Sequence, residues 1–134
     1  MVIDASAVLA VLLGEEDAGF FANAIEGAAN PRMSAVSALE VALVIGARKR
    51  ERGLEALDRF LDRSGIRIVG FDSEQWQLAR EAWWNYGKGR HAASLNLGDC
   101  RSYALAKATG DALLYKGDDF RRTDIRGVDR ESKE

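Results

Sequence analysis

Carboxylates lie beside apolar stretches in four separate parts of the chain. The acids at these places are Asp4, Glu40, Asp99 and the neighbouring pair Asp118 and Asp119. Carboxylate oxygens are the ligands that Mg²⁺ and Mn²⁺ prefer in proteins, and carboxylates that gather in one place repel one another unless a cation joins them. These residues therefore predict a site for a hard divalent cation, and such a site suits the hydrolysis of phosphodiester bonds.

The elements that must position these acids alternate between short β-prone runs and longer helical runs. Strands are predicted at 1–3, 32–34, 66–69, 112–115 and, as a last edge strand, 125–128; helices are predicted at 5–13, 15–28, 37–49, 54–63, 73–86 and 96–109. This alternation is typical of an α/β sandwich in which helices cover a mainly parallel sheet. The functional crevice of such a sheet lies outside the carboxyl ends of its strands, so we expect the acids to converge there.

Each acid also has an ordinary structural explanation. Glu40 stands three residues after Ser37, which is the spacing of a capping box, and Asp99 stands three residues after Asn96, a residue type favoured at helix starts. Asp4 would cap the helix that follows it, and the Gly-Asp-Asp run would form a turn. On these alternatives the acids serve the fold alone.

The burial expected for these acids favours the metal site. Helical spacing puts Glu40 on one face with Val36 and Leu43, which we expect to pack inward, and an unpaired carboxylate there would be costly. No Lys or Arg lies within one helical turn of Asp4 or Glu40 to form an ion pair. Ser6, two residues after Asp4, is a candidate to donate a hydrogen bond to an acid or to a substrate phosphate.

The composition excludes several other kinds of protein. The chain has 134 residues, 47% hydrophobic and 30% charged, which is typical of one soluble domain; we expect it at 1–130, followed by a loose tail at 131–134. One Cys and one His exclude a disulfide framework and a zinc finger, and His91 has no nearby acid to suggest a Ser/His/Asp arrangement. We find no membrane-spanning stretch and no secretory signal, so we predict a cytoplasmic protein.

The net charge of −2 neither predicts nor excludes a nucleic-acid partner. Basic residues nevertheless gather in clusters, and runs of this kind are more often solvated surface than binding sites. The candidates to steer a phosphate backbone are Arg48, Lys49, Lys88, Arg90 and Lys116.

Six segments together resemble the VapC toxins, a family of PIN-domain proteins. They read MVIDASA at 1–7, SALEV at 37–41, YGKGRH at 86–91, LNLGDCRSYALA at 95–106, LYKGDDF at 114–120 and TDI at 123–125. The resemblance covers nearly the whole chain. It implies a PIN-like three-layer sandwich, a Mg²⁺- or Mn²⁺-dependent endoribonuclease, a homodimer, and a cognate VapB-type antitoxin whose tail covers the acidic cleft.

Carried over by position, the resemblance assigns the site residues. Asp4, Glu40 and Asp99 match the family's three main acids, and Ser6 matches its active-site hydroxyl. The fourth acid varies between two neighbouring positions in the family. In this chain the two positions are Asp118 and Asp119, and we favour Asp118 slightly.

We expect the first and third of the main acids, Asp4 and Asp99, to ligate the metal most directly. Glu40 and either Asp118 or Asp119 would complete the shell or position water. One departure is Arg101, where family members more often carry an apolar or aromatic residue. This difference is expected to alter the rim of the RNA or antitoxin contact.

Two other classes of protein remain as alternatives. A non-catalytic PIN-like RNA-binding module would keep the fold and the basic rim but lose an acid, whereas all three main acids are present here. A receiver-like or phosphatase domain would also gather acids at strand ends. A receiver domain needs a phosphorylatable Asp at the end of a middle strand, followed by a partner Lys. Neither is apparent in the sequence.

Overall fold

The computed structural model describes residues 1–128, so the tail predicted at 131–134 lies outside the described residues. A parallel sheet forms its centre, in the order β3-β2-β1-β4. The strands are β1 (Val2–Ile3), β2 (Arg32–Ser34), β3 (Arg67–Val69) and β4 (Leu113–Leu114). The chain moves outward from β1 to β3 and then returns to the other side of β1, so the strand order reverses beside β1.

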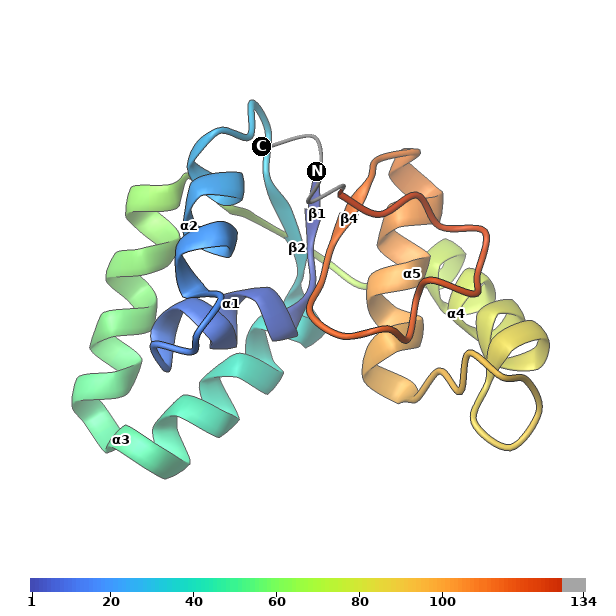
Figure 1. The fold of residues 1–134 in the computed structure, drawn as a ribbon, viewed down its shortest axis with the longest axis horizontal. Helices are drawn as coiled ribbons and strands as arrows, with labels where there is room; N and C mark the ends of the chain where they lie inside the picture. The colour runs from blue at the N-terminus through green and yellow to red at the C-terminus, as the bar shows by residue number, and fades with distance from the viewer. Residues whose placement is uncertain (129–134) are drawn as a thin grey trace.

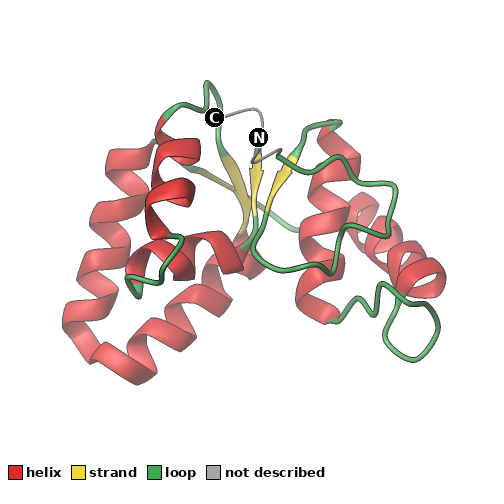
Figure 2. Cartoon of the chain, viewed as in Figure 1, coloured by secondary structure: helices red, strands yellow, loops and turns green. Residues whose placement is uncertain are grey.

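Helices cover both faces of this sheet, as Figures 1 and 2 show. One layer holds α1 (Ala5–Leu12), α2 (Ala18–Glu26) and α3 (Ala35–Ser64), and the opposite layer holds α4 (Ser73–Tyr86) and α5 (Leu97–Thr109). The three-layer α/β sandwich with a parallel sheet is therefore confirmed.

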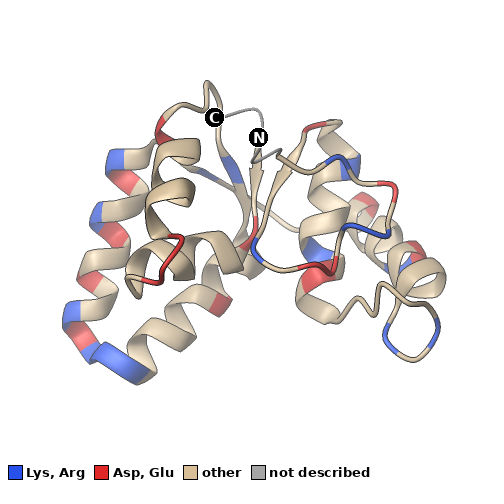
Figure 3. Cartoon of the chain, viewed as in Figure 1, with Lys and Arg blue, Asp and Glu red and all other residues tan. Residues whose placement is uncertain are grey.

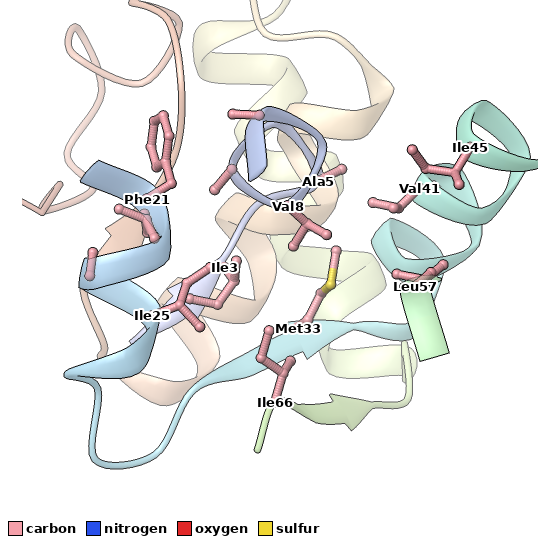
Figure 4. Packing of buried hydrophobic residues seen from close by; sticks show 14 residues of the cluster. Ile3, Ala5, Val8, Phe21, Ile25, Met33, Val41, Ile45, Leu57 and Ile66 are labelled. Carbon is pink, nitrogen blue, oxygen red and sulfur yellow. The ribbon is translucent and has the colours of Figure 1, made fainter. Parts of the chain in front are cut away.

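Two hydrophobic cores follow from the alternation of side chains along the strands. Ile3 and Met33 point into the core under α1, α2 and α3, where they contact residues such as Val8 (Figure 4). Val2 and Leu113 point into the second core under α4 and α5. Both faces of the sheet are covered at β1, β2 and β4, as is typical of parallel sheets, whereas β3 at the edge is largely exposed.

The helices predicted at 37–49 and 54–63 are two arms of α3, joined at an elbow. Arg50 has φ 54° and ψ −144°, which breaks the helical path at this residue. A Cβ added at Gly53 would lie 2.5 Å from Ile45 Cγ2, so only glycine allows the arms to approach this closely. Basic residues gather at the elbow, which is blue at the lower end of α3 in Figure 3.

The inward face of α3 differs from the predicted one. Val41 and Ile45 are buried, whereas Leu43 is 65% exposed, so the face that carries Glu40 and Leu43 lies at the surface. The prediction was wrong because two apolar stripes compete along this helix, and packing against α1 selected the other one.

The prediction of an edge strand at 125–128 is also wrong. Within residues 1–128 this segment forms a single bridge, in which Leu113 N donates to Arg126 O at 2.9 Å and Val128 N donates to Leu113 O at 3.0 Å. No helix in the described part of the chain is long and apolar enough to cross a membrane.

Candidate active site

Asp4 follows β1 and begins α1, at the carboxyl end of the sheet where the strand order reverses. Its Oδ2 accepts hydrogen bonds from Ser6 N at 3.0 Å and from Ser6 Oγ at 2.6 Å, so it caps α1 as expected. Its Oδ1 accepts a hydrogen bond from Ser102 Oγ on α5. Asp4 is buried, with 7% of the residue exposed, and two hydroxyl groups hold its carboxylate in one orientation.

Ser6 also ties the loop after β4 to this corner. Its Oγ accepts a hydrogen bond from Lys116 N at 2.9 Å, while the hydroxyl proton goes to Asp4. The ends of β1 and β4 are thereby fixed next to each other. The ammonium of Lys116 is engaged elsewhere, with Glu15 at 2.9 Å and Asp17 at 3.1 Å.

Asp99 lies in the first turn of α5 and is part of a capping box. Asp99 N donates to Asn96 Oδ1 at 2.9 Å, and Asn96 N donates to Asp99 Oδ2 at 3.1 Å. The structural explanation offered by the sequence is thus confirmed for this acid. It does not remove Asp99 from the site, because 8% of the residue remains exposed and its carboxyl group also interacts with a second acid.

That second acid is Asp119, from the loop after β4. Its carboxyl group interacts with that of Asp99. Burial raises the pKa of Asp99 to about 7, the hydrogen bond from the Asn96 backbone opposes this rise, and the contact with Asp119 and the charges of Asp119 and Asp4 add to it. We call Asp4, Asp99 and Asp119 the acid cluster.

Asp118, one residue earlier, lies outside this cluster. Its side chain is 85% exposed and forms an ion pair with Arg121 at 3.2 Å. Asp118 was slightly favoured over Asp119 as the fourth acid, and the structure brings Asp119 to Asp99 instead. Adjacent residues in a loop point in different directions, which no spacing pattern distinguishes.

Glu40 occupies a different environment. Its Oε1 accepts a hydrogen bond from Arg101 Nη2 on α5, and its side chain is 42% exposed. The capping box expected with Ser37 is wrong, because α3 begins earlier, with Ser34 as its N-cap. The absence of a cation within a helical turn did not leave Glu40 unpaired, since the partner comes from another element.

Two residues of the site escaped the sequence analysis as functional groups. Ser102, which donates to Asp4, stands three residues after Asp99 and thus on the same face of α5. That spacing was the available signal. Arg101 was noted only as a departure from the family pattern, and its contact with Glu40 joins residues 61 positions apart.

A cleft of about 520 Å³ opens beside Asp119 and carries cationic groups. It is lined by Ala92, Ala93, Ser94, Asp118, Asp119, Arg121 and Arg122. In Figure 3 the acidic segments near the centre of the molecule, at the lower ends of the strands, lie next to basic segments of the loop after β4. The site therefore combines a carboxylate centre with an arginine-bearing rim.

The acid cluster has the donor chemistry of a hard cation but is not a closed cage. No group of three His, Cys, Asp or Glu side chains in residues 1–128 lies closely enough together to hold a metal ion as the side chains stand. Mg²⁺ typically binds one or two carboxylates and keeps several waters, so the Asp99–Asp119 pair meets its needs. Across residues 1–128 no Lys or Arg forms an ion pair with the cluster.

Comparison with known proteins identifies the family of the chain. The family model "PIN domain" matches residues 1–126. Ribonuclease VapC30 from Mycobacterium tuberculosis is 50% identical over 128 residues, which cover 96% of this chain and 98% of the relative. Ribonuclease VapC from Mycolicibacterium smegmatis is 48% identical over 128 residues, covering 96% and 99%.

Solved structures show the same fold at low sequence identity. VapC20 from Mycobacterium tuberculosis, described as a toxin that cleaves the sarcin-ricin loop, superposes with a TM-score of 0.76 at 17% identity, covering 95% of this chain and 97% of that one. VapBC2 from Rickettsia felis, bound to a promoter DNA fragment, gives 0.74 at 15% identity and 96% of both chains. The chain belongs to the VapC family of PIN-domain ribonucleases.

Proposed function

We propose that this protein is a Mg²⁺- or Mn²⁺-dependent endoribonuclease that acts as the toxin of a VapBC-type system in the cytoplasm. The observation that carries the proposal is the contact between the carboxyl groups of Asp99 and Asp119, with Asp4 beside them. Without a cation this arrangement retains a proton, because two ionised carboxylates in contact repel each other. A divalent cation would replace that proton with a stronger positive charge.

The cluster would hold the metal through Asp99 and Asp119, with Asp4 next to them. When bound, such an ion lowers the pKa of a water molecule and stabilises charge on a phosphate. Ser6 and Ser102 keep Asp4 in one orientation by hydrogen bonds to its two oxygens. Such supporting hydrogen bonds keep acidic ligands in place, and their loss weakens metal binding.

The RNA would approach along the cleft beside Asp119. Arg121 and Arg122 line this cleft and supply positive charge next to the acids. Attack by water, without use of the ribose 2′-hydroxyl, would leave a 3′-hydroxyl and a 5′-phosphate. A substrate with a 2′-deoxy sugar at the cleaved position would therefore still be cut.

We also propose a VapB-type antitoxin and a second copy of the chain as partners. Large apolar side chains are exposed on α3, α4 and α5, namely Leu39, Leu43, Trp76, Trp83, Trp84 and Leu97. Exposed apolar patches of this kind are typical of protein interfaces. A toxin–antitoxin complex from Klebsiella pneumoniae has the same fold, with a TM-score of 0.68.

Cleavage of RNA by the purified, antitoxin-free chain tests the proposal. Total RNA is incubated with Mn²⁺ or Mg²⁺, with EDTA, and with EDTA followed by excess Mn²⁺; product ends are identified by whether a 5′-phosphate is present. We expect cutting only with the metal, and 5′-phosphate products. Asp4→Asn, which keeps the shape of the side chain, excludes a contaminating nuclease.

RNA binding without cleavage under any of these conditions would contradict the proposal and favour the RNA-binding module. Cleavage that persists in EDTA, or in Asp4→Asn at the rate of the parent chain, would contradict the role of the acids.

A further inference from the structure

Arg101 lies two residues after Asp99 on α5, and its guanidinium pairs with Glu40 of α3. Its Nη2 donates to Glu40 Oε1, and its side chain is 13% exposed, against 42% for Glu40. Its Nε is buried and has no hydrogen-bond partner. A buried guanidinium depends on its carboxylate partner, since an unpaired buried charge is costly. Glu40 is therefore held where Arg101 reaches it.

The geometry of α5 explains why Arg101 serves Glu40 and not the cluster. Asp99 and Ser102 are three residues apart and share a helical face, from which they contact Asp119 and Asp4. Arg101 is two residues from Asp99, and about 200° of helical rotation separates their directions. Asp99 and Ser102 of α5 therefore face the cluster, whereas Arg101 of the same helix faces α3.

Gly98 provides the space for this ion pair. A Cβ at position 98 would lie 3.0 Å from both Arg101 Nη2 and Glu40 Oε1, so any larger residue would press on the two charged groups. The Glu40 carboxylate therefore lies over the first turn of α5, one residue from Asp99. Its hydrogen bond with Arg101 holds it beside Gly98, the residue that precedes Asp99.

We propose that Arg101 is a positioning residue that keeps the Glu40 carboxylate out of the metal-binding set and so weakens the affinity of the site for divalent cations. The inference rests on the proposed function, because it requires a metal at the acid cluster. Glu40 carries one negative charge, and the guanidinium neutralises it. Removal of the guanidinium frees this carboxylate to turn toward the cluster and add a ligand.

Titration with Mn²⁺ in a calorimeter, without RNA, measures this effect. Arg101→Gln is expected to bind Mn²⁺ about tenfold more tightly than the parent chain. Arg101→Lys keeps the charge and should restore the parent affinity. The matched control is Lys107→Gln, which removes one positive charge from the exposed ion pair with Asp124 near the other end of α5 and should leave the affinity within about twofold.

Glu40→Gln separates release of Glu40 from simple loss of a positive charge. In the Glu40→Gln background, Arg101→Gln should give no gain in Mn²⁺ affinity, because no carboxylate is left to release. Gly98→Ala tests the same contact without any change of charge, should Arg101→Gln fail to fold. It crowds the pair and is expected to shift the affinity in the same direction.

The outcomes distinguish this inference from the proposed function. If the folded parent chain does not bind Mn²⁺, both are overturned. If it binds, but Arg101→Gln binds no more tightly, or gains as much in the Glu40→Gln background, only the role of Arg101 is overturned.

Discussion

The acid cluster and the Glu40–Arg101 pair are neighbours on α5, yet their negative charges are balanced in different ways. Glu40 has a guanidinium from the chain itself. Asp99, with Asp119 against it and Asp4 nearby, receives hydrogen bonds but no positive side chain from residues 1–128, and burial keeps its pKa high, at about 7. Glu40 is thus balanced within the chain, whereas the cluster, which has no such cation, is where we propose that the metal binds.

Asp99→Asn is expected to have the largest effect on RNA cleavage. The change keeps the shape of the side chain but removes a charged ligand, so RNA cleavage with Mn²⁺ should fall by at least about 100-fold. Initial cleavage rates at saturating Mn²⁺ measure the loss, and circular dichroism checks that the variant is folded. A rate within about threefold of the parent would show that the cluster is not the active centre.

The pH dependence of stability tests the protonation of Asp99 in the metal-free protein. Burial raises the pKa of Asp99 from 3.8 to about 7, so in the metal-free protein the folded state holds a proton that the unfolded state releases between these pH values. The free energy of unfolding in EDTA should therefore fall as pH rises from about 4 to 7, by at most about 4 kcal/mol from this group.

Urea denaturation at several pH values measures this slope. Asp99→Asn has no group to titrate and should lose this part of the pH dependence. The prediction fails if the parent and Asp99→Asn give parallel curves across the window.

A smaller effect is expected from Ser102→Ala. This change removes the hydroxyl that donates to Asp4 Oδ1 but leaves the hydrogen bonds from Ser6, so cleavage should fall by about tenfold. The matched control is Thr109→Ala, which removes a hydroxyl from the far end of α5, where it bonds only to the helix itself and the residue after Gly110. Equal losses in the two variants would point to a general effect on α5.

The smallest effect on ion binding is expected from Glu40→Gln. Because Arg101 already neutralises Glu40, the Mn²⁺ affinity should change by less than about fivefold, although the side chain lies one residue from Asp99. Direct titration with Mn²⁺ compares it with Asp99→Asn, which carries the same chemical change. A loss as large as that of Asp99→Asn would place Glu40 in the metal-binding set and erase the contrast.

Local sequence patterns predicted the part of the site that depends on local structure. Asp4 follows a strand and caps a helix, and Asp99 forms a capping box with Asn96, so each is positioned by its near neighbours. The sheet and its layers were also predictable, because strands and helices alternate clearly along the chain.

The remainder depends on contacts between distant segments. The Glu40–Arg101 pair joins α3 to α5, and the exposed face of α3 was settled by packing against α1. Asp118 and Asp119 are adjacent and chemically identical, so only the path of the loop after β4 decides which of them reaches Asp99. Composition and spacing contain no information on such choices.

The assignment of the metal to the acid cluster is tested most directly by Mn²⁺ titration of Asp119→Asn and Asp118→Asn. The two variants make the same change at adjacent positions, one on the acid cluster and one on the exposed ion pair with Arg121. We predict that Asp119→Asn weakens Mn²⁺ binding by at least about tenfold and that Asp118→Asn leaves it within about twofold. Unchanged binding in Asp119→Asn, or a larger loss in Asp118→Asn, would contradict the assignment of the metal to Asp4, Asp99 and Asp119.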